Sequence, residues 1–180
     1  MVKAYFFDWM GTLGDTTERM AIRETIGREI HLELLTKKFK DVKIPEEHKN
    51  AIYSRLINSR HWLYPDSERI ISNLKEGYKL AIISNMYEIT AGRIRKSFPD
   101  FLEMFDVVTL SAEVGLRKPD PKIFLYTLNI LNLINGVEIC PEEVMVIGDS
   151  QDKDVDAPKS IGMQARLIDR NTQTLNEVLK

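Results

Sequence analysis

Two short runs of the sequence are almost continuously apolar: 80–83 (Leu-Ala-Ile-Ile) and 144–147 (Val-Met-Val-Ile). A strand with one side in solvent alternates apolar and polar residues, so an unbroken apolar run of this length indicates a strand covered on both faces. Such strands are typical of parallel sheets that lie between two layers of helices. These two runs therefore favour an α/β fold.

The pattern of the other segments agrees with this fold. Strands are predicted at 2–9, 79–84, 105–110, 144–148 and 165–168. Helices are predicted between them, at 67–76, 87–97, 121–134 and 154–161. An alternation of strands and helices implies right-handed crossovers, so we predict a three-layer, doubly wound parallel sheet with a Rossmann-like core.

The segment 16–64 interrupts this alternation because it shows no strand pattern. Two amphipathic helices fit it, at about 17–40 and 45–62, with a turn at 41–45. A direct crossover between parallel strands needs only one helix. We therefore predict that 1–15 and 65–180 form the core and that 16–64 is a small helical insertion. The alternative is two ordinary helices of the main domain.

Composition limits the class of protein. The 180 residues carry a formal net charge of −2, which argues against a basic nucleic-acid-binding protein. The single cysteine excludes an internal disulfide framework and a cysteine-rich zinc site. No apolar run is long enough to cross a bilayer, and the apolar start is followed at once by Asp8, unlike a signal peptide. We therefore expect a cytoplasmic protein without nucleic-acid or membrane partners.

Residues able to carry chemistry stand at or soon after the ends of the predicted strands: Asp8, Ser84, Asn85, Lys118, Asp149 and Asp154. Each alone has an ordinary explanation, such as a turn former or a helix cap. Together they would meet at the sheet edge where open α/β folds bind ligands. Clustered carboxylates repel unless a cation lies between them, and Mg²⁺ suits oxygen ligands and substrate phosphate. Lys118 would offset the charge of an anionic substrate.

Four segments, in this order, resemble the motifs of the haloacid dehalogenase-like (HAD) hydrolase superfamily, which consists mostly of phosphatases. The segment 6–13 (FFDWMGTL) resembles a first motif that ends in a nucleophilic Asp followed by Gly-Thr. The segments 82–85 (IISN) and 111–121 (SAEVGLRKPDP) resemble the second motif and the region of the third-motif lysine. The segment 146–150 (VIGDS), with Asp154 behind it, resembles the fourth. In this family a helical cap follows the first motif, where 16–64 lies.

The resemblance implies covalent catalysis on a small phosphorylated metabolite. Asp8 would form an aspartyl-phosphate that water then hydrolyses. Lys118 would hold Asp8 and the substrate charge, and Ser84 with Asn85 would bind the transferring group. The implied magnesium ligands are the carboxylates of Asp8, Asp149 and Asp154 and the backbone carbonyl of Met10.

Position 10 departs from the family pattern. Phosphatases of this family usually carry a second Asp there, which protonates the leaving group and then activates water. The thioether of Met10 cannot do this work, which is worth 10²–10⁴-fold in rate in typical enzymes. We therefore expect slow turnover of poor leaving groups unless another group substitutes. The candidates are the histidines of the insertion: His31, His48 and His61.

Two alternatives remain open. A metal-independent 2-haloacid dehalogenase would also use Asp8 with Lys118, but the retained Asp149 and Asp154 are hard to explain for such a reaction. A binding or regulatory protein could have kept the metal site and lost turnover at Met10. Arginines of the insertion could contact substrate anions or simply be exposed: Arg19, Arg23, Arg55 and Arg60.

Overall fold

The computed structural model describes residues 1–17 and 21–180. Its centre is a five-stranded sheet in the order β5-β4-β1-β6-β7, in which every neighbouring pair is parallel. The strands are β1 (Ala4–Phe7), β4 (Lys79–Ser84), β5 (Val107–Leu110), β6 (Val144–Gly148) and β7 (Gln164–Leu167). The chain adds strands first on one side of β1 and then on the other. The predicted doubly wound parallel sheet is therefore confirmed.

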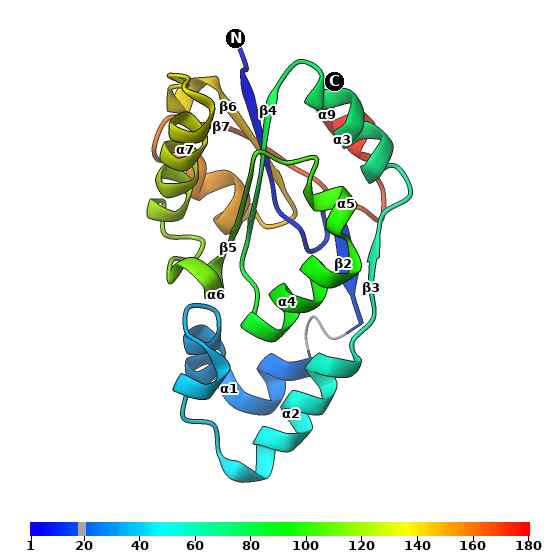
Figure 1. The fold of residues 1–180 in the computed structure, drawn as a ribbon, viewed down its shortest axis with the longest axis vertical. Helices are drawn as coiled ribbons and strands as arrows, with labels where there is room; N and C mark the ends of the chain where they lie inside the picture. The colour runs from blue at the N-terminus through cyan, green and yellow to red at the C-terminus, as the bar shows by residue number, and fades with distance from the viewer. Residues whose placement is uncertain (18–20) are drawn as a thin grey trace.

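Helices cover both faces of this sheet (Figure 1). One face packs against α3 (Ser67–Lys75), α4 (Glu88–Ser97), α5 (Pro99–Leu102) and α9 (Leu175–Leu179). The other packs against α7 (Lys122–Asn135) and α8 (Ala157–Lys159). Successive residues of a strand pack on opposite faces of the sheet. Phe7 and Ile82 belong to the hydrophobic cluster on the first face, and Phe6 and Ala81 belong to the cluster on the second. This two-sided burial explains why the strands are apolar throughout.

The helical insertion lies at one end of the molecule, at the bottom of Figure 1. It contains α1 (Ala21–Leu34), the 3₁₀ turn η1 (Phe39–Asp41) and α2 (Glu46–Asn58). These elements share a hydrophobic cluster of their own: Ile26, Leu34, Val42, Ile44, Ile52 and Leu56. A separate cluster agrees with a small cap, although the division at 16–64 stays a prediction.

Two strands correct the prediction for this region. β2 (Gly14–Thr16) and β3 (His61–Leu63) form an antiparallel ribbon that flanks the insertion and joins it to the core. The predicted helices 17–40 and 45–62 are too long, because α1 ends at Leu34, with a non-helical break at Gly27, and α2 ends at Asn58. Three-residue strands are too short to show alternation, which is why the sequence pattern missed them.

A further correction concerns the helix predicted at 154–161. The turn begins earlier, as the π-helical segment η3 (Gln151–Asp156), and α8 follows it directly. Asp154 is therefore inside the turn and buried, instead of at an exposed helix start. The remaining short elements are α6 (Ser111–Val114) and η2 (Pro141–Glu143). Among the helices of the described ranges, none has the length and apolar character that crossing a membrane requires.

Candidate active site

The carboxyl ends of the central strands bring the predicted residues together. Phe7 of β1 lies in register with Ile82 of β4 and Ile147 of β6, so the residues that follow these strands reach the same edge. The backbone N–H of Asp8 donates to the carbonyl of Ile147 at 2.9 Å, which continues the pairing one residue beyond the strand. Asp8 is thereby held at the sheet edge, at the centre of the site.

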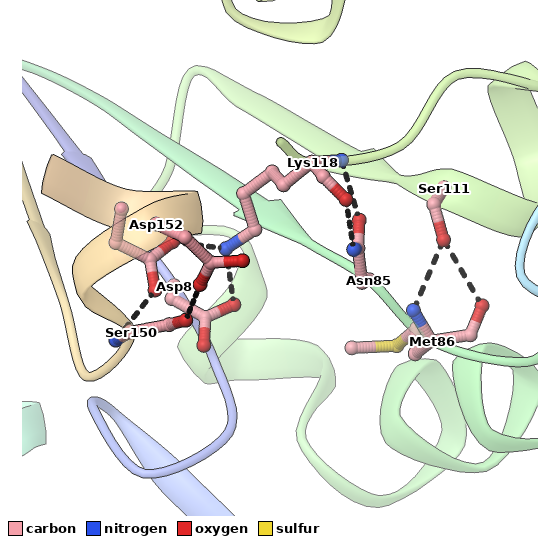
Figure 2. A network of polar contacts seen from close by, with 8 residues as sticks. Asp8, Asn85, Met86, Ser111, Lys118, Ser150 and Asp152 are labelled. Carbon is pink, nitrogen blue, oxygen red and sulfur yellow. Dashed lines mark hydrogen bonds and ion pairs between the residues drawn. The ribbon is translucent and has the colours of Figure 1, made fainter. Parts of the chain in front are cut away.

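Lys118 is the side chain that connects the site (Figure 2). Its Nζ donates to Oδ1 of Asp8 at 2.8 Å and to Oδ1 of Asp154 at 2.5 Å, and the side chain is only 2% exposed. Burial alone lowers the pKa of the ammonium, but the Asp154 and Asp8 carboxylates outweigh burial and hold this pKa above its ordinary value. Lys118 therefore stays charged between two acidic groups.

Asp154 is held from two sides. The backbone N–H of Ser150 donates to its Oδ2 at 3.0 Å, and Lys118 contacts the other oxygen. Burial, opposed by the Lys118 ammonium and reinforced by the Asp8 charge, raises the pKa of this carboxyl to about 6. A Cβ on Gly148 would lie 2.3 Å from Cγ of Asp154, so only glycine lets this side chain pack against the end of β6.

Three carboxylates of the site fit a metal ion. Asp8, Asp149 and Asp154 each offer an oxygen, and these oxygens all lie within 4.8 Å of one another. Asp8 and Asp154 are buried and Asp149 is half-buried. Such hard oxygen donors beside a cavity suit Mg²⁺, because this ion keeps several water ligands and commonly binds together with a substrate phosphate. Met10 lines the same cavity, and a role for its carbonyl as a ligand stays a prediction.

Asn85 contacts the backbone of Lys118. Its Nδ2 donates to the Lys118 carbonyl at 2.7 Å, and its Oδ1 accepts from the Lys118 N–H at 2.8 Å (Figure 2). This pair of hydrogen bonds fixes the lysine segment against the end of β4. Asn85 also lines the cavity, so the predicted contact with substrate stays a prediction beside this positioning role.

Ser84 is placed differently from the other predicted residues. It is fully buried and is absent from the residues that line the cavity. Within the described part of the chain, its Oγ has no hydrogen-bond partner. An unsatisfied buried hydroxyl is costly, so this oxygen is a group that a ligand or water could satisfy.

A cavity of about 470 Å³ lies between the sheet edge and the insertion. The core supplies the acidic residues and Lys118, and the insertion supplies side chains of α1 and α2. Of the three histidines, His31 lines this cavity and His48 and His61 do not. Of the arginines predicted to contact anions, Arg23 lines it and Arg55 and Arg60 do not. Arg19 lies outside the described residues.

His31 and Tyr87 join the insertion to the core. The His31 Nδ1 lies 2.6 Å from the Tyr87 hydroxyl, which stands just before α4. Burial, with Arg23, Lys153 and Arg117 nearby, lowers the pKa of His31 to about 4. Burial raises the pKa of Tyr87. Both groups are therefore neutral at pH 7, and we assign the Tyr87 hydroxyl as the donor to Nδ1, which leaves the proton on Nε2.

Asp152, which follows the predicted strand end at 144–148, lines the cavity, while sequence reasoning missed four other lining residues: Arg28, Tyr87, Arg117 and Lys153. Arg117 and Lys153 adjoin Lys118 and Asp154, and Tyr87 follows Asn85 by two residues, so nearness in sequence was a signal that could have found them. Arg28 carried no such signal, because its place depends on how the insertion folds back over the sheet edge.

A family model described as haloacid dehalogenase-like hydrolase matches residues 31–162, well over half of the chain. The chain therefore belongs to the haloacid dehalogenase-like hydrolase family. This confirms the resemblance that the four sequence segments indicated.

Relatives and solved structures agree with this assignment. A phosphoserine phosphatase of Thermus thermophilus is 30% identical over 112 residues, which cover 62% of this chain and 42% of that protein. A glyceraldehyde 3-phosphate phosphatase of Methanopyrus kandleri is 33% identical over 106 residues, covering 56% and 40%. The chain thus spans about two fifths of these relatives. A HAD family enzyme of Bacteroides thetaiotaomicron, solved with magnesium and inorganic phosphate, shares the fold over 100% of both chains, with a TM-score of 0.73 and 16% identity.

Proposed function

We propose that this protein is a Mg²⁺-dependent phosphatase that acts on a small phosphorylated compound in the cytoplasm. The observation that carries the proposal is the group of Asp8, Asp149 and Asp154 carboxylates, with the Lys118 ammonium buried against two of them. The cavity above this group has room for a small molecule. The phosphatase names of the relatives support the same reaction class.

In the first step an oxygen of Asp8 attacks the phosphorus of the ester. A bond forms between this oxygen and phosphorus, the bond from phosphorus to the ester oxygen breaks, and the departing oxygen takes a proton from water. Lys118 fixes Oδ1 of Asp8, which leaves Oδ2 to attack. Bound Mg²⁺ supplies charge neutralisation for the phosphoryl oxygens. The chain contributes mainly positioning and fixed charge, which carry most of the barrier reduction in phosphoryl transfer.

In the second step water attacks the phosphorus of the aspartyl-phosphate. The bond to Asp8 breaks, the carboxylate is restored and inorganic phosphate leaves, while the proton released by the attacking water passes to a phosphate oxygen or to solvent water. A nearby base would normally take the proton of the attacking water, and the Met10 thioether cannot accept it. His31 is a weak base because its pKa is about 4. The proposed enzyme is therefore expected to be slow and to favour aryl phosphates, whose leaving groups need little protonation.

Two alternatives differ from this proposal in what they need. A dehalogenase without metal has no use for three clustered carboxylates, so the Asp149 and Asp154 positions argue against it. A binding protein that has lost turnover is favoured by Met10. Metal-dependent hydrolysis would identify the phosphatase, halide release would identify the dehalogenase, and metal binding without turnover would identify the binding protein.

The test measures hydrolysis of p-nitrophenyl phosphate with Mg²⁺, with EDTA, and after Asp8→Asn. We expect EDTA to stop turnover and Asp8→Asn to lower kcat by more than about 10³-fold, because the attacking oxygen is lost. Asp156→Asn is the control, since Asp156 is exposed and does not line the cavity. Turnover that survives EDTA, or chloride release from 2-chloropropionate, would contradict the proposal. Mg²⁺ binding without hydrolysis would favour the binding protein.

A further inference from the structure

The cavity has a basic wall as well as an acidic one. Besides Lys118, four cationic side chains line it: Arg23 and Arg28 of α1, Arg117 next to Lys118, and Lys153 of η3. They come from three segments that are far apart in the sequence. Arg23, Lys153 and Arg117 all act electrostatically on the His31 ring, which lines the same cavity. We call these four residues the basic wall.

In the part of the chain that the structure describes, the basic wall forms no direct ion pair. Within residues 1–17 and 21–180, none of its four cations forms an ion pair with a carboxylate, whereas Lys118 forms two. Asp152, next to Lys153 in the chain, also lines the cavity; its Oδ1 accepts a hydrogen bond from the Ser150 hydroxyl at 2.6 Å, and this bond together with the Lys153 charge lowers its pKa. Arg23 and Arg28 are exposed and Arg117 and Lys153 are half-buried, so all four cations are accessible to an anion in the cavity. This arrangement therefore suits an anionic ligand.

A single phosphoryl group does not account for the whole basic wall. The phosphoryl group has its own partners at the sheet edge, namely Lys118 and the carboxylate group that fits Mg²⁺. Arg23 and Arg28 instead belong to α1 of the insertion and line the cavity from there. His31 stands among them as a neutral ring whose Nε2–H remains available to donate. Guanidinium groups bind carboxylate and phosphate through paired hydrogen bonds.

We propose that the substrate is a phosphomonoester with a second anionic group, and that the basic wall binds this second group while Asp8 attacks the phosphate. This inference rests on the proposed phosphatase function and adds a substrate class to it. The substrate class is a molecule with at least two separate anionic groups: the phosphate that is hydrolysed, and a second group that is either a phosphate or a carboxylate. Arg23 and Arg28 are the residues that would select it.

The experiment compares synthetic esters that differ only at the far end. The probes are alkanediol bisphosphates of three to six carbons, ω-phosphooxy alkanoates and plain alkyl phosphates of the same lengths. For at least one length, we expect kcat/KM for an ester with a second anion to exceed that of the plain ester roughly tenfold to a hundredfold, as charged hydrogen bonds allow. Comparing kcat/KM for the bisphosphates with kcat/KM for the phosphooxy alkanoates shows whether a phosphate or a carboxylate is preferred as the second anion.

Variants then assign the preference to the basic wall. In Arg23→Gln and Arg28→Gln, and most in the double variant, the ratio of kcat/KM between doubly anionic and plain esters should fall to within about twofold of one. Arg60→Gln is the matched control, because Arg60 is exposed on the same insertion but does not line the cavity. It should keep the ratio of the unmodified protein.

Binding provides a readout that does not need turnover. Titration calorimetry on the Asp8→Asn protein should show tighter binding of the doubly anionic ester, and Arg23→Gln should remove this difference. Equal binding and equal kcat/KM for both kinds of ester, with Mg²⁺-dependent hydrolysis intact, would overturn this inference and leave the phosphatase proposal standing. Preferential binding without hydrolysis of these esters or of p-nitrophenyl phosphate would support the basic wall and count against the phosphatase.

Discussion

The Lys118 Nζ lies 2.8 Å from Oδ1 of Asp8, although 110 residues separate the two positions in the chain. Both side chains are buried, and the same ammonium also contacts Asp154. A buried charge needs partners in place, so this contact links the stability of the fold to the geometry of the site.

Lys118→Met should destabilise the protein strongly. The variant leaves the Asp8 and Asp154 carboxylates buried without their cation, a loss worth about 3–5 kcal/mol in the free energy of unfolding. Urea unfolding at pH 7 measures it. Lys3→Met is the control, because Lys3 pairs with Glu143 at the same 2.8 Å but is more than half exposed, so its loss should change the free energy of unfolding little. Equal losses in the two variants would contradict the structural role of Lys118.

Met10→Asp should raise the rate with alkyl phosphates. A carboxyl group at this position of the cavity could protonate the leaving oxygen, and general acid–base catalysis typically contributes about 10²–10⁴-fold. The gain should be smaller with p-nitrophenyl phosphate, whose leaving group needs little protonation. Met10→Asn is the matched control, since it has the same shape without the acid. Steady-state kinetics of all three proteins would show whether the carboxyl is responsible.

Gly148→Ala should disturb the site through packing alone. The added Cβ would lie 2.3 Å from Cγ of Asp154, which must move away from Lys118 and the metal-binding group. We expect a loss of about 1–3 kcal/mol in the free energy of unfolding and weaker Mg²⁺ binding. The matched control is Gly92→Ala in α4, where a Cβ meets nothing within 4 Å and should stabilise by about 0.5–1 kcal/mol. Unchanged Mg²⁺ affinity in Gly148→Ala would argue against this packing constraint.

His31 should lower the free energy of unfolding as pH drops from about 6.5 to about 4, while Asp154, whose pKa is raised to about 6, acts in the opposite direction. The pKa of this residue is about 4 in the folded protein and 6.5 in a free histidine, so the unfolded chain binds the proton first. The contribution is complete above pH 6.5 and is lost below, by roughly 1–2 kcal/mol once solvent screening of a half-buried group is allowed for. The measurement is the free energy of unfolding against pH for the unmodified protein and His31→Asn. Identical slopes in the two proteins would exclude this role.

Much of the core was predictable from sequence, because its strands are buried on both faces and leave a continuous apolar pattern. The sites of Asp8, Asp149 and Lys118 followed from the rule that parallel strands end at one edge. The ribbon of β2 and β3 was not predictable, since its partners are three residues long and lie on either side of the insertion. The extent of α1 was also missed, because helix ends depend on packing as well as on local pattern.

The sequence by itself determined the parallel sheet, the family and the acidic residues at the strand ends, since these depend on local apolar pattern and on residues adjacent to it. The resemblance implied that Lys118 holds Asp8, but only the tertiary structure decided that the same ammonium contacts Asp154 and that Arg28 and Lys153 line the same cavity. These contacts join positions far apart in the chain. Those within the core depend on how the segments after the strands pack at the sheet edge, and that of Arg28 depends on how the insertion folds over this edge, which no local pattern encodes.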